Sequence, residues 1–109
     1  MAAREVGSHR VSPSTHQVLA ALLGDPGADR WFALDLCRRT GLSSGSVARI
    51  LLRMEQLGWV ESRWELRAEA SSLGRPRRRF YRLTGTGRRV AWQQTRQPPP
   101  PRIIWAQLS

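Results

Sequence analysis

Apolar residues recur at the spacing of an α-helix between Ser43 and Gly58. They fall on one stripe of a helix with 3.6 residues per turn, made of Val47, Ile50, Leu51, Met54 and Leu57. Ser43 is a typical N-cap, because its hydroxyl can accept from a free backbone N–H, and Gly58 is a typical stop. The pattern predicts a helix whose exposed face carries Ser44, Ser46, Ala48, Arg49 and Arg53.

Two further helices are predicted upstream. Gly41 follows a short apolar run of Leu34, Leu36 and Cys37, and two helices joined by a few residues that include a glycine indicate a helix-turn-helix. An earlier run, comprising Val18, Leu19, Leu22 and Leu23, predicts the first helix, which we expect Ser14 or Thr15 to cap. Residues 1–12 show no period and are expected to form a flexible arm.

Alternating residues downstream predict two strands, over Trp59–Trp64 and Arg79–Leu83. The segment between them is too long for a tight turn, so we expect a wing loop. Thr84 is placed to cap a last short helix, whose first turn Gly85 and Gly87 weaken.

The predicted fold class is α+β: a winged helix-turn-helix with a three-helix core, a two-stranded wing and a short C-terminal helix. Four prolines forbid helix beyond about residue 97. We therefore divide the chain into an arm (1–12), a DNA-binding domain (13–97) and a proline-rich spacer with an apolar tail (98–109).

The charge of the chain is strongly uneven. The net charge is +10, and residues 38–109 hold fifteen arginines and four glutamates, or +11. Seven arginines lie within residues 75–89 with no acid among them, and they would repel one another unless a polyanion or solvent compensated. A basic surface beside a helix-turn-helix favours double-stranded DNA as the partner, although a solvated basic face is the alternative.

Other functional classes find little support in the composition. Two histidines, one cysteine and no cluster of carboxylates predict neither an enzyme nor a metal or cofactor site. Cys37 is expected to be a small core residue rather than a redox switch. The chain has no apolar run of membrane-spanning length and no signal peptide, so a cytoplasmic protein is expected.

Several of these motifs together resemble the PadR family of winged-helix transcriptional regulators. They are Gly41-Leu42-Ser43, Gly45-Ser46, the segment from Leu51 to Gly58, and Gly74-Arg75-Pro76-Arg77 before Tyr81-Arg82-Leu83-Thr84. Related MarR-type regulators usually carry a wing tip of mixed acidic and basic residues instead. The resemblance implies a short strand or helix start at Trp31-Phe32, and an aromatic residue where this chain has Ala48. It also implies a dimer formed by the C-terminal helix and the partner's first helix.

We expect one set of residues to bind DNA and another to form a homodimer. The DNA set combines the exposed face of the 43–57 helix with the wing: Ser44, Ser46, Arg49, Arg53, Arg75, Arg77, Arg78 and Arg79. The dimer set is Leu19, Leu22, Val90, Trp92, Ile103, Ile104 and Trp105. A dimeric repressor is the favoured interpretation.

Two other functions use the same residues. A phage or mobile-element protein that shapes DNA would need the same helix and wing. Alternatively, the resemblance implies a regulator that binds a flat, apolar effector near Trp92, where a dimer-core role is the simpler reading.

Deletion of residues 98–109 tests the role of the apolar tail. If Ile103, Ile104 and Trp105 pack across the dimer, light scattering will show a smaller particle for the truncated chain. An unchanged dimer would instead favour packing of the tail on its own first helix, or no role in assembly.

Overall fold

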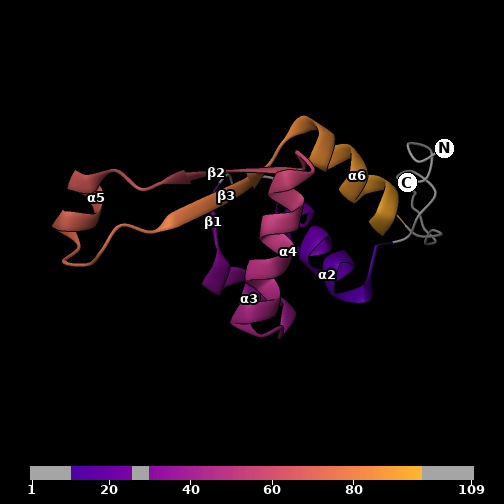
Figure 1. Ribbon diagram of the computed structural model, residues 1–109, viewed down its shortest axis with the longest axis horizontal. Coiled ribbons are helices and arrows are strands. Elements are labelled where there is room, and N and C mark those ends of the chain that lie inside the picture. The colour runs from indigo at the N-terminus through magenta and orange to yellow at the C-terminus, as the bar shows by residue number, and fades with distance from the viewer. Residues whose placement is uncertain (1–10, 26–29, 97–109) are drawn as a thin grey trace, which may run out of the picture.

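A computed structural model describes residues 11–25 and 30–96 as a helical body from which a long β-hairpin extends (Figure 1). The body contains α2 (Pro13–Leu23), α3 (Ala33–Thr40), α4 (Ser44–Gln56) and α6 (Gly85–Thr95). The hairpin is formed by β2 (Val60–Trp64) and β3 (Arg79–Leu83), with α5 (Arg67–Ser72) at its far end. A two-residue strand, β1 (Trp31–Phe32), completes a winged helix-turn-helix of the α+β class, as predicted.

The core lies where α2, α3 and α4 meet the base of the sheet. Its buried side chains come from all the predicted apolar stripes and comprise Val18, Leu19, Leu22, Trp31, Leu36, Val47, Leu51, Met54, Trp59, Val60, Leu83 and Ala91. Cys37 packs against this core as a free thiol. Leu34 and Leu57, which the sequence pattern placed on apolar faces, are instead exposed.

Capping residues set the limits of the helices. Ser43 accepts from the backbone N–H of Ser46 at the start of α4, and Gly41 and Gly58 take the left-handed conformation that ends α3 and follows α4. The expected cap of the first helix was wrong by two or three residues. Ser12, rather than Ser14 or Thr15, caps α2, because Pro13 occupies the first helical position, where its missing N–H costs nothing.

The sheet has three strands rather than the two expected, in the order β1-β3-β2, all antiparallel. Trp31 pairs with Tyr81 and Phe32 with Phe80, so the aromatic pair before α3 forms the added edge strand. The predicted hairpin strands are confirmed, with Val60 opposite Leu83 and Trp64 opposite Arg79. The wing loop is not irregular throughout, because α5 occupies residues 67–72.

The C-terminal helix is held against the turn that follows α4. Thr84 caps α6 by accepting from the N–H of Gly87 (2.9 Å), and its hydroxyl donates to the carbonyl of Gly58 (2.6 Å). A Cβ atom on Gly87 would lie 1.8 Å from the carbonyl oxygen of Trp59. The glycine that seemed to weaken this helix therefore permits its close approach to the backbone. No helix among residues 11–25 and 30–96 is long and apolar enough to cross a bilayer.

Replacement of Gly87 by alanine tests this close contact. Because the methyl group would overlap the Trp59 carbonyl, α6 must shift, and we expect Gly87→Ala to lower the unfolding free energy by about 1–3 kcal/mol. Gly85→Ala is the matched control, since nothing lies within 4 Å of its Cβ position and alanine favours helix. Equal thermal stabilities for the two variants would contradict the packing described.

Candidate nucleic-acid interface

The exposed face of α4 carries small side chains near its start and arginines further along. Ser44, Ala48, Arg49 and Arg53 are exposed, while Val47, Leu51 and Met54 on the opposite face are buried. Small residues permit close approach of the helix to base edges, and arginine can donate two hydrogen bonds to guanine or contact phosphate. The structure thus leaves three of the four predicted α4 residues, Ser44, Arg49 and Arg53, exposed.

Ser46 differs from the other three. Its backbone N–H donates to the Ser43 hydroxyl (3.2 Å), and the two hydroxyls are 3.1 Å apart. Its half-buried side chain is therefore engaged in the helix cap, although the uncapped N–H groups of this first turn still favour an anion nearby.

The wing is built around the carboxylate of Glu65, which is only 2% exposed. Arg75 donates to both carboxylate oxygens, through Nη1 to Oε1 and through Nη2 to Oε2 at 2.9 Å. The backbone N–H of Arg78 donates to Oε1 at 2.9 Å, and its Nε lies 3.6 Å from the same oxygen. Arg77 Nε donates to the backbone carbonyl of Glu65 at 2.8 Å. One buried acid thus fixes three of the seven clustered arginines.

These hydrogen bonds change the acidity of Glu65. The bonds from Arg75, with smaller contributions from Arg78, outweigh the effect of burial and lower the pKa of Glu65 from 4.5 to about 2. The same interaction raises the pKa of Arg75. A folded-state pKa below the unfolded value means that this pairing stabilises the wing above about pH 4.5 and is lost as pH falls through 2.

The remaining glutamates of the basic half also pair with arginines. Glu55 at the end of α4 contacts Arg79 (3.2 Å), which also donates to Ser62 (3.0 Å), so α4 is joined directly to β3. Glu61 pairs with Arg82 (2.6 Å). The sequence pattern assigned compensation of the clustered arginine charge to a polyanion or solvent. In the structure, part of that compensation comes from glutamates of the chain itself.

A stack of rings and guanidinium groups connects β1 to the wing. Arg78 lies 3.8 Å from the ring centre of Phe32, and Arg30 lies 4.5 Å from that of Phe80. The two rings meet edge to face at 6.2 Å, and Arg30 also pairs with Glu69 of α5 at 3.0 Å. These contacts hold the outer part of β3 against β1 and join α5 to the residue that precedes β1.

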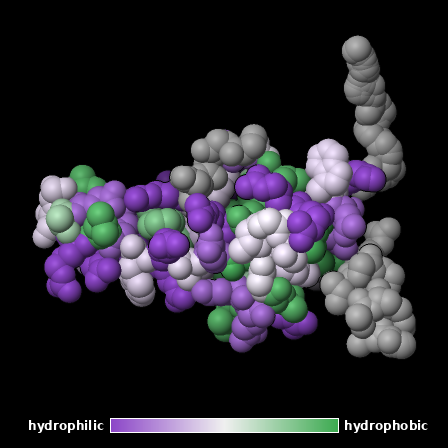
Figure 2. All heavy atoms as spheres, turned by 90° about the horizontal axis from the view of Figure 1, so that it is seen from above, coloured by the Kyte–Doolittle hydropathy of each residue, from purple (hydrophilic) through white to green (hydrophobic). Residues whose placement is uncertain are grey.

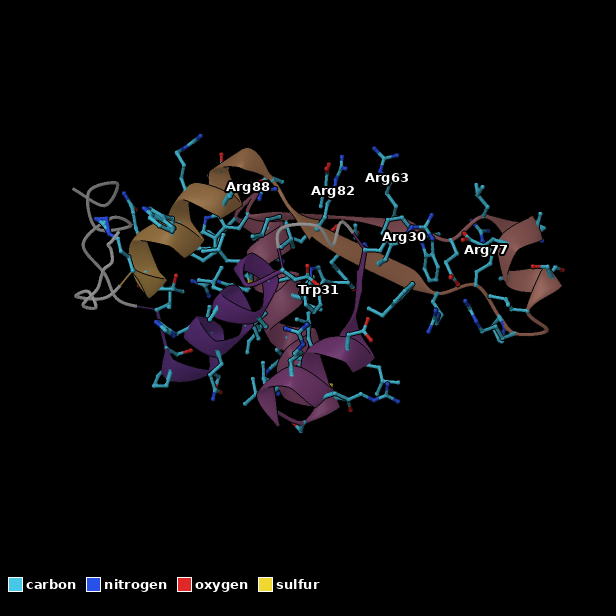
Figure 3. All side chains as sticks on the ribbon, turned by 180° about the vertical axis from the view of Figure 1, so that it is seen from behind. Arg30, Trp31, Arg63, Arg77, Arg82 and Arg88 are labelled. Atoms are coloured by element: carbon cyan, nitrogen blue, oxygen red, sulfur yellow. The ribbon has the colours of Figure 1, made fainter. Side chains whose placement is uncertain are left out.

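The predicted DNA-binding arginines therefore fall into two groups. Arg75 and Arg78 pair with Glu65, and Arg79 pairs with Glu55, so part of the donor set of these three arginines is engaged within the chain. Within the described residues, no carboxylate lies within ion-pair distance of Arg49, Arg53 or Arg77. Figure 3 shows Arg77 close to α5, while Arg63 and Arg82 point away from the helical body.

The residues expected to form a dimer are widely separated. Leu19 and Leu22 belong to the core of the single chain, so the expectation that they form an interface does not fit. Val90 is half-buried, whereas Trp92 on α6 is 59% exposed. Ile103, Ile104 and Trp105 lie outside the described residues.

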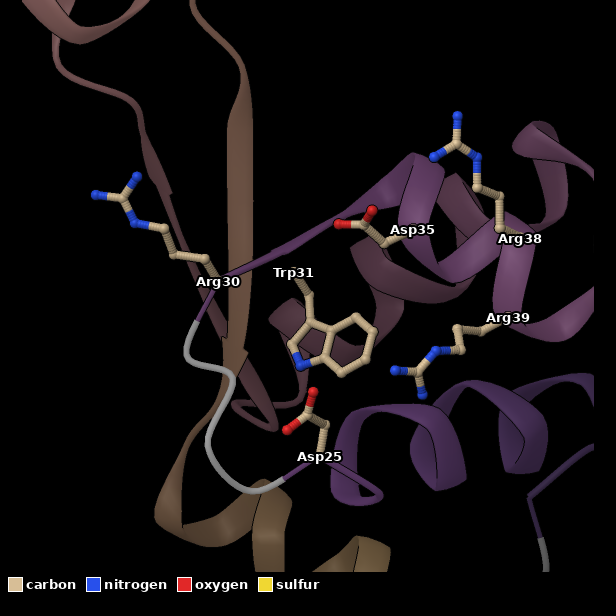
Figure 4. A pocket seen from close by; sticks show the side chains of 6 residues that line it. All are labelled: Asp25, Arg30, Trp31, Asp35, Arg38 and Arg39. Carbon is tan, nitrogen blue, oxygen red and sulfur yellow. The ribbon is translucent and has the colours of Figure 1, made fainter.

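A cavity of about 360 Å³ lies between the end of α2 and the start of α3 (Figure 4). It is lined by Asp25, Arg30, Trp31, Asp35, Arg38 and Arg39. Trp31 is 5% exposed, and its indole N–H has no hydrogen-bond partner among the residues that the structure describes. The indole nitrogen faces Asp25, and the guanidinium of Arg39 lies 5.1 Å from the ring centre. Nothing in the sequence pattern singled out this place.

Comparisons with known proteins agree with this architecture. The family model of the MarR family matches residues 11–65. A protein from Ralstonia eutropha JMP134 assigned as DNA-binding superposes with a TM-score of 0.57 at 22% identity, over 76% of this chain and 95% of its own. The transcriptional regulator PcaV of Streptomyces coelicolor, solved with its natural ligand, gives 0.61 at 24% identity, over 79% of this chain and 54% of PcaV. A search of curated proteins finds no match.

The winged-helix regulator identified from sequence is thus confirmed, but its assignment to the PadR family is not supported. The assignment to PadR relied in part on the arginine-rich wing, because MarR-type wings usually carry both acidic and basic residues. In the folded wing, Glu65 and Glu69 lie among the arginines, so the contrast disappears.

The role of Glu65 predicts a specific effect of its neutralisation. Glutamine keeps the size of the side chain but cannot balance Arg75 and Arg78, so Glu65→Gln should disorder the wing, lower the Tm and weaken DNA binding. The wild-type wing should lose order between about pH 4 and pH 2, a transition that the variant should lack.

Glu61→Gln provides the control. Its exposed pair with Arg82 should contribute little, so this variant should keep nearly the stability and affinity of the wild type. If both variants behave alike in thermal unfolding and DNA titrations, Glu65 does not organise the wing.

Proposed function

The chain belongs to the MarR family of winged-helix DNA-binding transcriptional regulators, and on this premise we propose that it is a homodimeric repressor. In this proposal α4 enters the major groove, with Arg49 and Arg53 at base edges or adjacent phosphates. The wing lies along the backbone, with Arg77 as its principal phosphate contact. The activity is binding rather than catalysis.

The observation that carries the proposal is the division of the arginines. Those that pair with glutamates build the wing, whereas Arg49, Arg53 and the terminal nitrogens of Arg77 keep their donors available. Because Arg77 Nε is fixed to the Glu65 carbonyl, its guanidinium is held in one orientation before DNA arrives. Phosphate contacts fix the register of a protein on DNA, and base contacts give specificity.

Dimerisation and repression complete the proposal. Trp92 presents a large exposed ring on α6, and burial of that ring against a second copy would remove it from water. We propose repression because a protein bound at a promoter can block transcription by its presence alone. Activation would need a further contact with the polymerase. If no sequence is preferred over random DNA, the alternative of an architectural DNA-binding protein takes its place.

Two arginine variants test the assigned roles on a duplex selected from a random library by this protein. Arg49→Ala should reduce the preference for the selected over a scrambled duplex by about 10- to 100-fold, the effect of one lost base contact. Arg77→Ala should weaken both duplexes alike and reduce the salt slope by about one. Arg63→Ala, on the sheet face away from α4, is the control and should change neither by much. Exchanged results for Arg49 and Arg77 would mean that their roles are reversed.

A ligand-sensing regulator is a second candidate, favoured by the buried indole N–H of Trp31, which has no partner within residues 11–25 and 30–96. A small molecule could offer it an acceptor, and three arginines against two aspartates in the described lining would favour an anion there. The ligand-bound structure of PcaV supports the idea in outline. This proposal moves the effector from Trp92, which is exposed, to the cavity at Trp31.

Benzoate serves as the probe for this site. Saturating benzoate should raise the Tm of the wild type and of Trp92→Phe, but not that of Trp31→Phe, which keeps the ring and lacks the N–H. If only Trp92→Phe loses the Tm shift, the effector binds near Trp92 on α6 instead. The absence of any shift for benzoate and related small carboxylates would count against ligand sensing.

A further inference from the structure

The end of the wing has an inverted distribution of polar and apolar side chains. Its interior holds the Glu65 carboxylate and the guanidinium of Arg75, while Leu66 and Leu73 are 69% and 61% exposed. These two leucines, here called the apolar tip, flank α5 as its N-cap and C-cap residues. Figure 2 shows apolar side chains among charged ones at this end, far from the helical body.

The apolar tip is held outward by ordered structure. Ala70, 2% exposed, packs α5 against the wing, and its carbonyl accepts from the N–H groups of Leu73 (3.1 Å) and Arg75 (3.2 Å). Gly74 takes a positive φ of 67° just after Leu73. Since the ion pair of Glu65 fills the interior, the leucines cannot fold into it, and two large apolar side chains stay in water at a cost.

The charges around the tip indicate what can cover it. Arg67 and Arg77 are exposed at this end of the hairpin, and among the described residues no carboxylate lies within ion-pair distance of either. A partner that is strongly anionic outside and apolar inside suits this combination. Duplex DNA meets both requirements, because its phosphates flank stacked bases, and leucine is among the residues that enter the minor groove between base pairs.

We propose that Leu66 and Leu73 form a wedge that enters a base step in the minor groove and kinks the bound DNA. This inference rests on the proposed function, since α4 must first place the protein on the duplex. The arginines beside the tip hold the flanking phosphates, and the rigid Glu65 cluster resists the force needed to separate the bases. A pyrimidine–purine step is the expected position, because such steps unstack most readily.

The experiment uses the selected duplex with 2-aminopurine in place of adenine at each pyrimidine–purine step, and dyes at its ends. On binding of the wild-type protein, fluorescence should rise at the wedged step, and energy transfer should report a bend of about 20–90°. In the double variant Leu66→Ala/Leu73→Ala, both signals should be lost while affinity changes by less than about tenfold. The methionine double variant, which keeps apolar side chains of similar length, should restore both signals.

Leu34→Ala/Leu57→Ala is the matched control, because it removes two exposed leucines that lie outside the wing. Its DNA should be kinked as by the wild type. Both alanine doubles should keep the wild-type Tm, since none of the four side chains is buried.

Four results would overturn the wedge, and the last of them would overturn the proposed function as well. Tight binding of the wild type without a fluorescence rise or bend would overturn the wedge and leave the proposed function standing. A kink that persists in Leu66→Ala/Leu73→Ala would place its origin elsewhere. If that variant loses only its cooperativity of DNA binding, the apolar tip contacts a second copy of this chain rather than DNA. Failure of the wild type to select any duplex would overturn the proposed function together with the wedge.

Discussion

The buried carboxylate of Glu65 is the interaction on which the arginine-rich wing depends. Without a buried acid, charge repulsion among Arg75, Arg77 and Arg78 would separate the two arms of the hairpin. With Glu65 in place, the same charges become donors to one centre, and the strand pairing of the hairpin continues beyond its last regular pair through the Glu65 N–H and the Arg78 carbonyl (2.8 Å). The lowered pKa of Glu65 follows from these hydrogen bonds, which favour the ionised carboxylate. Arginines that would otherwise repel one another therefore stabilise the hairpin through their hydrogen bonds to Glu65.

This construction links the wing to the recognition helix. Glu55 on α4 contacts Arg79 on β3, and Ser62 donates to the same carboxylate (2.7 Å). The orientation of α4 and the direction of the hairpin are therefore set together, so the two elements proposed to bind DNA meet it as one rigid surface. A preorganised surface loses less conformational entropy on binding, which favours affinity from few contacts. The arginines left without acids, above all Arg49 and Arg53, are the ones available for discrimination.

Helical period and strand alternation predicted most of the fold, because long, regular elements leave repeated marks in a sequence. The stripe from Val47 to Met54, the cap at Ser43 and the strand pair were all visible in this way. A two-residue strand and a six-residue helix are too short to show a period, so β1 was expected only from the family resemblance, as a short strand or helix start, and α5 was missed. The structural role of Glu65 arises from residues 10 to 13 positions apart and becomes visible only in the register of the hairpin. Once Trp64 is placed opposite Arg79, Glu65 falls opposite Arg78.

Because Glu65 pairs with arginines of its own chain, the wing should be fully formed before it meets DNA. Amide hydrogen exchange of the free protein tests it most directly at two positions: the N–H of Arg78, which donates to the Glu65 carboxylate, and the N–H of Glu65, which donates to the Arg78 carbonyl. If the Glu65 cluster orders the wing, both amides exchange slowly in the absence of DNA, with protection approaching that of the β2–β3 ladder. Fast exchange of both in the free protein, with protection appearing only after DNA is added, would show that DNA rather than Glu65 orders the wing.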